Sequence, residues 1–273
     1  MAAPKLVEGP GCFVFSDQGA TNWSVRVHYF CPSGPVENAR IAIALHGLDR
    51  AAEEFRDILV GPAERTGQII IVPEFDLVQF SGSYAYNQGY VTGPPPSNFP
   101  RPREQWSFYL IDRLFQHVRS TTSSKHDTFG LFGNSAGGQF VLRYLALTEA
   151  KTVDRAVAAN IGWYMLPDLA RDYPIGMCGV GAGDGDLRRY LQRPLTIILG
   201  EGDCDPNAHD LPRLDAAMAQ GPHRLARGLW YFDHCKQLAL DLNIDFGWIL
   251  MTIPGAGHID PPIFENGIRL LSD

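Results

Sequence analysis

The side chains of this sequence that could do chemistry together are a serine, a histidine and one of two aspartates. Ser135 is the central residue of Gly133-Asn134-Ser135-Ala136-Gly137-Gly138, and the pattern Gly-x-Ser-x-Gly is typical of a sharp turn from a strand into a helix. Such a turn exposes the serine oxygen, and the glycines let strand and helix approach closely. The helix N-terminus favours a developing negative charge, so Ser135 is suited to nucleophilic attack on a carbonyl carbon.

A serine hydroxyl is a weak nucleophile until a neighbouring base takes its proton. Among the eight histidines, His258 is the best placed, because it lies in a glycine-rich segment (254–260) that follows the last apolar run. Loops at the carboxyl ends of strands are where α/β folds collect reactive groups. We therefore expect His258 to meet Ser135 at the edge of a sheet.

The base must itself be oriented by a carboxylate, and two aspartates compete for that role. Asp203 lies in the first turn after a predicted strand at 195–199, whereas Asp205 directly precedes a proline. An Asp-Pro pair more often begins a turn or caps a helix, so Asp203 is the predicted acid and Asp205 the alternative. The resulting chain order is Ser, Asp, His, which distinguishes one fold from the other serine-hydrolase arrangements.

Alternating strands and helices must bring these residues together. Short, almost continuously apolar runs are typical of parallel strands buried on both faces, and they lie at 41–45, 69–72, 129–132, 153–161, 195–199 and 248–253. Two strands at 12–16 and 23–30 predict a hairpin with one solvated face. Helical spacing is found at 51–65, 105–118, 136–147, 211–242 (with a break near Gly221-Pro222) and 262–271. The sequence thus predicts an α/β fold with an eight-stranded, mostly parallel sheet and helices on both faces.

One domain spanning residues 1–273 is expected, because no shift in composition and no internal repeat divides the chain. The N-terminal hairpin covers about 11–31. Two stretches fit no element: 79–103 is rich in proline and aromatic residues, and 167–193 is rich in glycine and aspartate. Loops of this length in a compact domain are usually lids or binding loops.

Composition excludes several classes of protein. Hydrophobic residues make up 45% and charged residues 19% of the chain, which is not the composition of a disordered segment. A net charge of −7 disfavours nucleic acid and anionic membranes as partners, and no apolar run is long enough for a membrane helix. The N-terminus has no apolar signal segment, so we expect a cytoplasmic protein, with export as the alternative if a leader has been removed.

The five cysteines, Cys12, Cys31, Cys178, Cys204 and Cys235, include no Cys-x-x-Cys pair, so no zinc site of the usual spacing is expected. Cys12 and Cys31 lie in adjacent predicted strands and could form a disulfide in an exported protein. The glycine-aspartate run at 181–186 lacks the regular ligand series of a calcium loop, and there is no dinucleotide fingerprint. No metal and no cofactor are predicted.

From about Arg40 to its C-terminus, the chain resembles the α/β-hydrolase superfamily. The elbow around Ser135 and the order of the three residues carry this resemblance, together with Leu45-His46-Gly47, which resembles the oxyanion loop. The stretches at 46–50 and 54–57 are similar to the polyhydroxybutyrate depolymerase and feruloyl-esterase-like branch. The resemblance implies an α/β-hydrolase fold with loop-type lid insertions and the activity of a serine esterase.

The resemblance also implies roles for further residues. The backbone N–H groups of Leu48 and Ala136 would form the oxyanion hole, and His46 would position the loop. Trp163 and Tyr164 resemble the aromatic wall of polyester-hydrolysing relatives, with packing at a strand end as the alternative. Three tyrosines of the proline-rich stretch would line the same cleft or pack within the core, namely Tyr84, Tyr86 and Tyr90.

The predicted function is hydrolysis of a carboxylic ester, an aromatic ester or polyester among the candidates, through an acyl-enzyme on Ser135. The partner is then a small-molecule or oligomeric ester substrate. Two alternatives stay open: an acyltransferase that uses the same three residues, and a catalytically silent scaffold that serves as a binding module.

Overall fold

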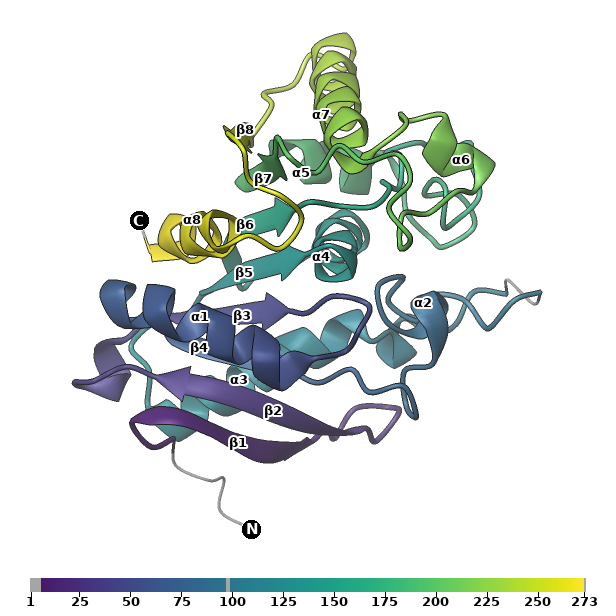
Figure 1. Cartoon of the computed structure of the whole chain (residues 1–273). Helices are drawn as coiled ribbons and strands as arrows, with labels where there is room; N and C mark the ends of the chain where they lie inside the picture. Colours follow the sequence, from purple (N-terminus) through teal and green to yellow (C-terminus); the bar gives the residue numbers. More distant parts are fainter. Residues whose placement is uncertain (1–5, 97–98, 273) are drawn as a thin grey trace.

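An eight-stranded sheet runs through the protein (Figure 1). The structure is a computed structural model that describes residues 6–96 and 99–272. The strands are β1 (Gly9–Ser16), β2 (Ser24–Cys31), β3 (Ile41–Leu45), β4 (Ile69–Pro73), β5 (Phe129–Asn134), β6 (Val153–Ala159), β7 (Leu195–Gly200) and β8 (Trp248–Ile253). They lie in the order β1-β2-β4-β3-β5-β6-β7-β8. Antiparallel pairing joins β1 to β2 and β2 to β4, and the other pairs are parallel. The predicted sheet is confirmed.

Helices cover both faces of the sheet. They are α1 (Ala52–Thr66), α2 (Gly82–Ala85), α3 (Phe108–Thr122), α4 (Ala136–Leu147), α5 (Asp184–Gln192), α6 (Asp215–Met218), α7 (Arg224–Asp241) and α8 (Pro261–Ser272), with short 3-10 helices at Val36–Asn38 and Arg103–Gln105. Helices α1 and α8 pack side by side on one face, and α3, α4, α5 and α7 pack on the other (Figure 1). Within the described residues, no helix combines the length and the apolar character that a membrane crossing requires.

Strand β3 shows why the central strands have no polar face. Ile41, Ile43 and Leu45 belong to the apolar cluster beneath α3 and α4, whereas Ala42 and Ala44 belong to the cluster beneath α1 and α8. Both faces of the strand are covered, so each residue along it must be apolar. The carboxyl ends of the parallel strands point to one edge of the sheet, and the loops at that edge carry the residues singled out from the sequence.

Three segments differ from the prediction. Of the helix expected over 211–242, residues 211–214 are not helical, while the predicted break near Gly221-Pro222 is present between α6 and α7, where Gly221 has a φ of 145° and Pro222 cannot continue a helix. The stretch 79–103 contains α2, and its residues 97–98 lie outside the described part of the chain. The stretch 167–193 contains α5, whose N-terminus is capped because the Gly183 amide donates to Asp186 Oδ2 at 2.9 Å.

The sequence held a signal for α5. Leu187, Tyr190 and Leu191 are buried and have the spacing of one helix face. The glycines and aspartates that suggested a loop lie at the N-terminal end of this helix, where acidic residues are favourable.

The possible disulfide between Cys12 and Cys31 is absent. Both thiols are free, and the register of β1 and β2 places Cys12 opposite His28 and Cys31 opposite Gly9. The two cysteines therefore do not face each other across the ladder.

The close approach of α4 to the end of β3 depends on a glycine. A Cβ atom at Gly137 would lie 1.9 Å from the Leu45 carbonyl oxygen, and one at Gly133 would lie 2.3 Å from the Gly137 carbonyl group. These contacts involve backbone atoms, which cannot move aside as a flexible side chain does. The two glycines of the Ser135 pattern thus allow the helix to begin directly above the strands.

We expect Gly137→Ala to destabilise the fold by about 3 kcal/mol, at the upper end of the usual cost of overpacking. Gly185→Ala is the matched control, because a Cβ atom at this position in α5 would have no neighbour within 4 Å. The control should leave stability unchanged or raise it by about 0.5 kcal/mol, since alanine favours helix. Urea unfolding of both variants checks this, and equal stabilities would contradict it.

Candidate active site

Ser135 occupies the turn between β5 and α4 with φ 56° and ψ −114°. A positive φ is unfavourable for a residue with a side chain, so neighbouring contacts must hold this turn. The Ser135 amide donates to the Ala159 carbonyl at 2.9 Å, and the Gln139 amide donates to the Ser135 carbonyl at 3.1 Å. Bonds to β6 and within α4 therefore fix the serine, which is partly exposed at the carboxyl edge of the sheet.

The loops after β7 and β8 bring Asp203 and His258 into contact. Nδ1 of His258 lies 2.7 Å from Oδ2 of Asp203. The aspartate side chain is only 7% exposed and the histidine side chain 21%, so the carboxylate can orient the ring while the ring stays accessible. Asp205 is exposed instead, and its Oδ1 accepts from the Asn207 amide at 2.8 Å in a local turn. Asp203 is the aspartate that contacts His258.

Asn160, which the sequence did not single out, holds the loop that carries His258. Its Nδ2 donates to the carbonyls of Gly257 at 3.2 Å and His258 at 3.0 Å, and its Oδ1 accepts from the Gly200 amide at 2.8 Å. The residue has a φ of 46°, a conformation in which asparagine is enriched. The predicted strand over 153–161 concealed Asn160, because β6 ends at Ala159, two residues before the predicted end.

The amides expected to form an oxyanion hole make no backbone hydrogen bond among the described residues. In the described part of the chain, Ser135 Oγ has no hydrogen-bond partner; catalytic hydrogen bonds are often long in unliganded enzymes and tighten with substrate. Among the backbone hydrogen bonds of residues 6–96 and 99–272 outside the helices and strands, none uses the amide of Leu48 or of Ala136. Available N–H groups are what an oxyanion hole requires.

His46 and Tyr86 anchor the loop that carries Leu48. His46 donates from Nδ1 to the Gly47 carbonyl at 2.9 Å and accepts at Nε2 from the Phe75 amide at 3.1 Å. The Tyr86 hydroxyl donates to the His46 carbonyl at 2.6 Å. This pattern needs a neutral imidazole, and burial lowers the pKa of His46 to about 4. His46 therefore occupies the structural position that the resemblance implied.

Arg50 joins the same loop to the stretch that follows β4. Its guanidinium donates to the carbonyls of Phe75 at 2.6 Å, Phe80 at 3.1 Å and Gly82 at 3.1 Å, and it lies 4.2 Å from the centre of the Tyr86 ring. Three carbonyls from two turns are thus bound by one buried cation. No sequence pattern indicates this role, which depends on the direction of three carbonyls that lie far from Arg50 in the sequence.

The aromatic residues expected to contact substrate lie inside the protein. Tyr86 and Tyr164 are fully buried, and Tyr164 stacks on Tyr231 with 4.4 Å between ring centres. Trp163 is 5% exposed, and the Arg143 guanidinium lies 4.9 Å from its ring. In this structure these rings pack within the core, which is the alternative that the sequence left open.

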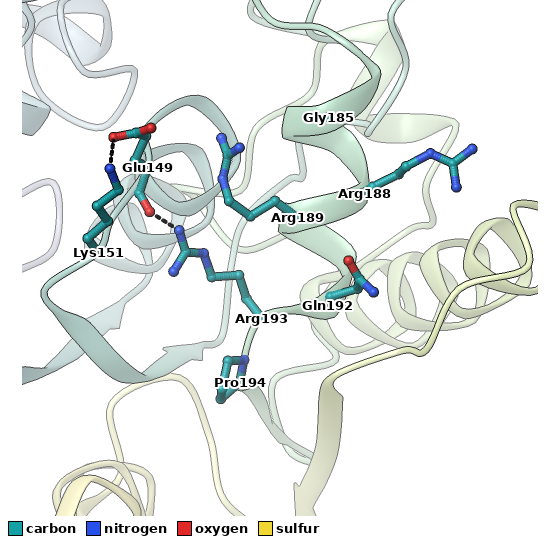
Figure 2. Close-up of a pocket in the computed structure, with 8 residues that line it drawn as sticks. All are labelled: Glu149, Lys151, Gly185, Arg188, Arg189, Gln192, Arg193 and Pro194. Atoms are coloured by element: carbon teal, nitrogen blue, oxygen red, sulfur yellow. Dashed lines mark hydrogen bonds and ion pairs between the residues drawn. The ribbon is translucent and has the colours of Figure 1, made fainter.

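The pocket in Figure 2 lies at the opposite edge of the sheet from Ser135. It has a volume of about 460 Å³ and is lined by Glu149, Lys151, Gly185, Arg188, Arg189, Gln192, Arg193 and Pro194. Lys151 and Pro194 precede β6 and β7, whereas reactive groups in α/β folds follow the carboxyl ends of strands. Its lysine is paired with Glu149 at 2.8 Å. The residues singled out from the sequence do not line this pocket.

The glycine-aspartate segment is not arranged as a metal site. Asp184 pairs with Arg188 at 2.6 Å, and Asp186 pairs with Arg189. Within the described residues, no group of three or more His, Cys, Asp or Glu side chains is placed to hold a metal ion.

Several solved structures share this fold, and two of them are also similar to this chain in sequence. A poly(aspartic acid) hydrolase from Sphingomonas sp. KT-1 is 38% identical over 98% of this chain and 100% of its own, with a TM-score of 0.93. The chain belongs to the α/β-hydrolase superfamily. A poly(3-hydroxybutyrate) depolymerase from Bordetella parapertussis is 29% identical over 97% of this chain and 89% of its own, with a TM-score of 0.88. The predicted resemblance to polyhydroxybutyrate depolymerases is confirmed.

More distant α/β-hydrolases share the fold alone. An S-formylglutathione hydrolase from Agrobacterium tumefaciens is 14% identical, with a TM-score of 0.60 over 96% of this chain and 95% of its own. No family model matches the sequence, and no curated protein matches it.

The low pKa of His46 predicts a specific pH dependence of stability. The unfolded chain takes up this proton near pH 6.5 and the folded chain only near pH 4, so stability is lost as the pH falls through this interval. The loss amounts to about 3 kcal/mol. In His46→Gln the side-chain oxygen can still accept from Phe75, but no proton binds. Urea unfolding at pH 7 and pH 4 should show a larger loss for the wild type, and parallel losses would refute this origin.

We expect Asn160→Asp to lower kcat/KM for p-nitrophenyl acetate about 10- to 100-fold, because small misplacements of a catalytic group are costly. The variant keeps the acceptor for Gly200 but turns the donor that binds the Gly257 and His258 carbonyls into a repelling carboxylate. Asn266→Asp is the control, since Asn266 Nδ2 bonds only within α8, to the Pro262 carbonyl at 2.9 Å. Similar kinetics for the two variants would contradict the proposed role of Asn160 in holding the loop that carries His258.

Proposed function

We propose that this protein is a serine hydrolase that cleaves carboxylic esters through an acyl-enzyme on Ser135. The observation that carries the proposal is the position of these residues after three strands, at the same edge of the sheet. Ser135 lies in a strained turn after β5, and the contact of His258 with Asp203 joins the loops after β7 and β8. A nucleophile, a base and a carboxylate that orients the base are the parts that nucleophilic acyl transfer needs.

In the acylation step, His258 Nε2 takes the proton of Ser135 Oγ as the oxygen attacks the ester carbonyl carbon. Asp203 stabilises the resulting imidazolium through Nδ1. The carbonyl oxygen becomes an oxyanion that the amides of Leu48 and Ala136 stabilise, and each such donor contributes about 10²–10³ in rate. The tetrahedral intermediate then collapses, and His258 protonates the departing alcohol.

Deacylation repeats these steps with water. His258 removes a proton from water as the water oxygen attacks the acyl carbon, and the same two amides stabilise the second oxyanion. Ser135 Oγ leaves with the proton from His258, which restores the free enzyme and releases the carboxylic acid. Since His258 must be neutral to act as a base, kcat/KM should rise with pH along an acidic limb and then level off.

The charges around the site favour a neutral substrate. Exposed carboxylates lie on the loops that carry the site residues, namely those of Asp49, Asp205, Asp210 and Asp260. Of the arginines near these loops, Arg50 and Arg224 are buried and bound to carbonyl or carboxylate groups, whereas Arg213 is exposed and donates to the Pro206 carbonyl at 3.0 Å. A polyanion would meet like charges at this edge, whereas an uncharged ester or polyester would not.

A second candidate substrate is poly(aspartic acid) itself. The full-length similarity to the Sphingomonas enzyme, at 38% identity, favours this candidate, and the exposed carboxylates oppose it. Initial rates on poly(3-hydroxybutyrate), on poly(aspartic acid) and on a chain-length series of p-nitrophenyl esters separate the two. Cleavage of the polyanion with no cleavage of any ester would overturn the ester proposal.

Two other uses of the same site have their own tests. An acyltransferase would pass the acyl group to an added alcohol or amine instead of water, so product analysis with and without that nucleophile distinguishes it. A silent binding module would not react with a fluorophosphonate at Ser135, whereas an active serine hydrolase would.

We expect Ser135→Ala and Asp203→Asn to lower kcat by about 10⁴ or more without unfolding the protein, as in other serine triads. Asp205→Asn is the matched control, because Asp205 accepts only a local amide. The control should keep near-normal activity. The proposal fails if Ser135→Ala retains more than a tenth of the activity. The assignment of Asp203 as the acid fails if Asp205→Asn loses activity while Asp203→Asn stays nearly normal.

A further inference from the structure

A buried arginine holds the carboxylate that contacts His258. Arg224 is the first residue of α7, and its side chain is 3% exposed. Its Nη1 lies 3.3 Å from Asp203 Oδ1, while the other carboxylate oxygen, Oδ2, contacts His258. The two oxygens of Asp203 are thus divided between two cationic or potentially cationic partners, which fixes the rotation of the carboxylate.

Arg224 is itself held by a second aspartate. Its Nη2 lies 2.7 Å from Oδ1 of Asp210, a side chain that is 39% exposed. Although partial burial acts in the other direction, the hydrogen bond from Arg224 and the charges of Arg224 and His258 lower the pKa of Asp210. Asp210 therefore carries its negative charge in the field of His258. The four side chains form a chain of alternating charge: Asp210, Arg224, Asp203 and His258.

The backbone of α7 reinforces this contact. The Leu225 amide donates to the Asp203 carbonyl at 3.2 Å, so the first turn of the helix is bound to the loop that carries the acid. The N-terminus of an 18-residue helix adds a partial positive charge beside the carboxylate. The positive charges of Arg224 and of the α7 N-terminus both make the electrostatic potential at Asp203 less negative. They therefore have the same effect at the His258 imidazole, which Asp203 contacts.

We propose that Arg224, paired with Asp210, is a positioning residue of this site that fixes the Asp203 carboxylate and sets the pH at which His258 becomes a competent base. The inference rests on the proposed function and deepens it. With neutral His258, the other three charges sum to −1, and a proton on the imidazole brings the sum to zero. Removal of the arginine leaves −2 and favours that proton, whereas removal of the Asp210 charge leaves zero and opposes it.

Other charged or titratable groups lie around these four side chains. His209 lies 4.0 Å from Asp210, and His223 accepts at Nδ1 from the Ala226 amide at 3.2 Å. The charge of Asp203 contributes, after burial, to the raised pKa of Tyr164, which stays protonated. Asp260, on the loop of His258, accepts from the Gly257 amide at 2.7 Å. Arg227 lies one turn along α7 and binds the Gly162, Pro212 and Gly221 carbonyls. All five groups are kept in the variants of Arg224 and Asp210.

The test is the pH profile of kcat/KM for p-nitrophenyl acetate in Arg224→Met, Asp210→Asn and Arg227→Met. We expect the acidic limb to move up by at least about half a pH unit in Arg224→Met and down by a similar amount in Asp210→Asn. Arg227→Met is the matched control, because it removes another buried guanidinium from the same helix without touching Asp203. Its limb should stay in place even if the variant is less stable.

Opposite shifts are the result that a merely structural role would not give. The proposal is overturned if both limbs stay in place, if they move in the same direction, or if Arg227→Met moves the limb as far. Asp210→Asn changes a partly exposed side chain to one of equal size, so it remains decisive if Arg224→Met fails to fold.

A titration of His258 by NMR, assigned with His258→Gln, separates this proposal from the proposed function. The titration needs no substrate and should show the same opposite shifts. If Ser135→Ala kept its activity, the proposed function would fail, while the titration would still test whether Arg224 changes the protonation of His258. If the titration of His258 were the same in all variants, the role of Arg224 would fail while the serine mechanism stood.

Discussion

The contact of α4 with the end of β3 is the constraint on which the site depends. Gly137 lies against the Leu45 carbonyl so closely that a methyl group cannot fit. This contact sets the helix N-terminus, the strained turn of Ser135 and the loop that begins at His46 at fixed distances from one another. The amides of Leu48 and Ala136 lie on the two sides of the contact, so one close approach positions both the nucleophile and the donors proposed to stabilise its oxyanion.

Buried polar side chains supply hydrogen bonds to the loops, as the backbone hydrogen bonds of the sheet do for the strands. The described loops at the carboxyl edge extend beyond the strands of the sheet, and buried carbonyls without donors are costly. Asn160, Arg50 and Arg224 supply donors at three places along this edge: to the loop after β8, to the turns after β4 and to the acid after β7. Each one joins segments that are distant in sequence, and together they give irregular backbone the rigidity that catalysis needs.

The fold is shared more widely than its chemistry. Proteins that are 14% identical have the same fold, which shows that the layers tolerate almost complete change of sequence, provided that the apolar faces are kept. In α/β folds the loops at the carboxyl edge are the part that contacts a ligand. In this protein they present exposed carboxylates next to a buried network of alternating charge, and this charge pattern, more than the fold, bears on the choice between neutral esters and a polyanion.

The sequence by itself determined the succession of strands and helices, the sharp turn at Ser135 and the pairing of Asp203 with His258, because short-range rules govern apolar periodicity and tight turns. It also located the break before α7 at Gly221-Pro222, but it missed α5, since glycine and aspartate mark helix ends as well as loops. Only the tertiary structure decided that Tyr86 and Tyr164 are buried, that Cys12 and Cys31 are apart, and that Arg224 and Asn160 hold the site. These outcomes depend on long-range packing, in which the partner of a side chain lies on another loop and no local pattern names it.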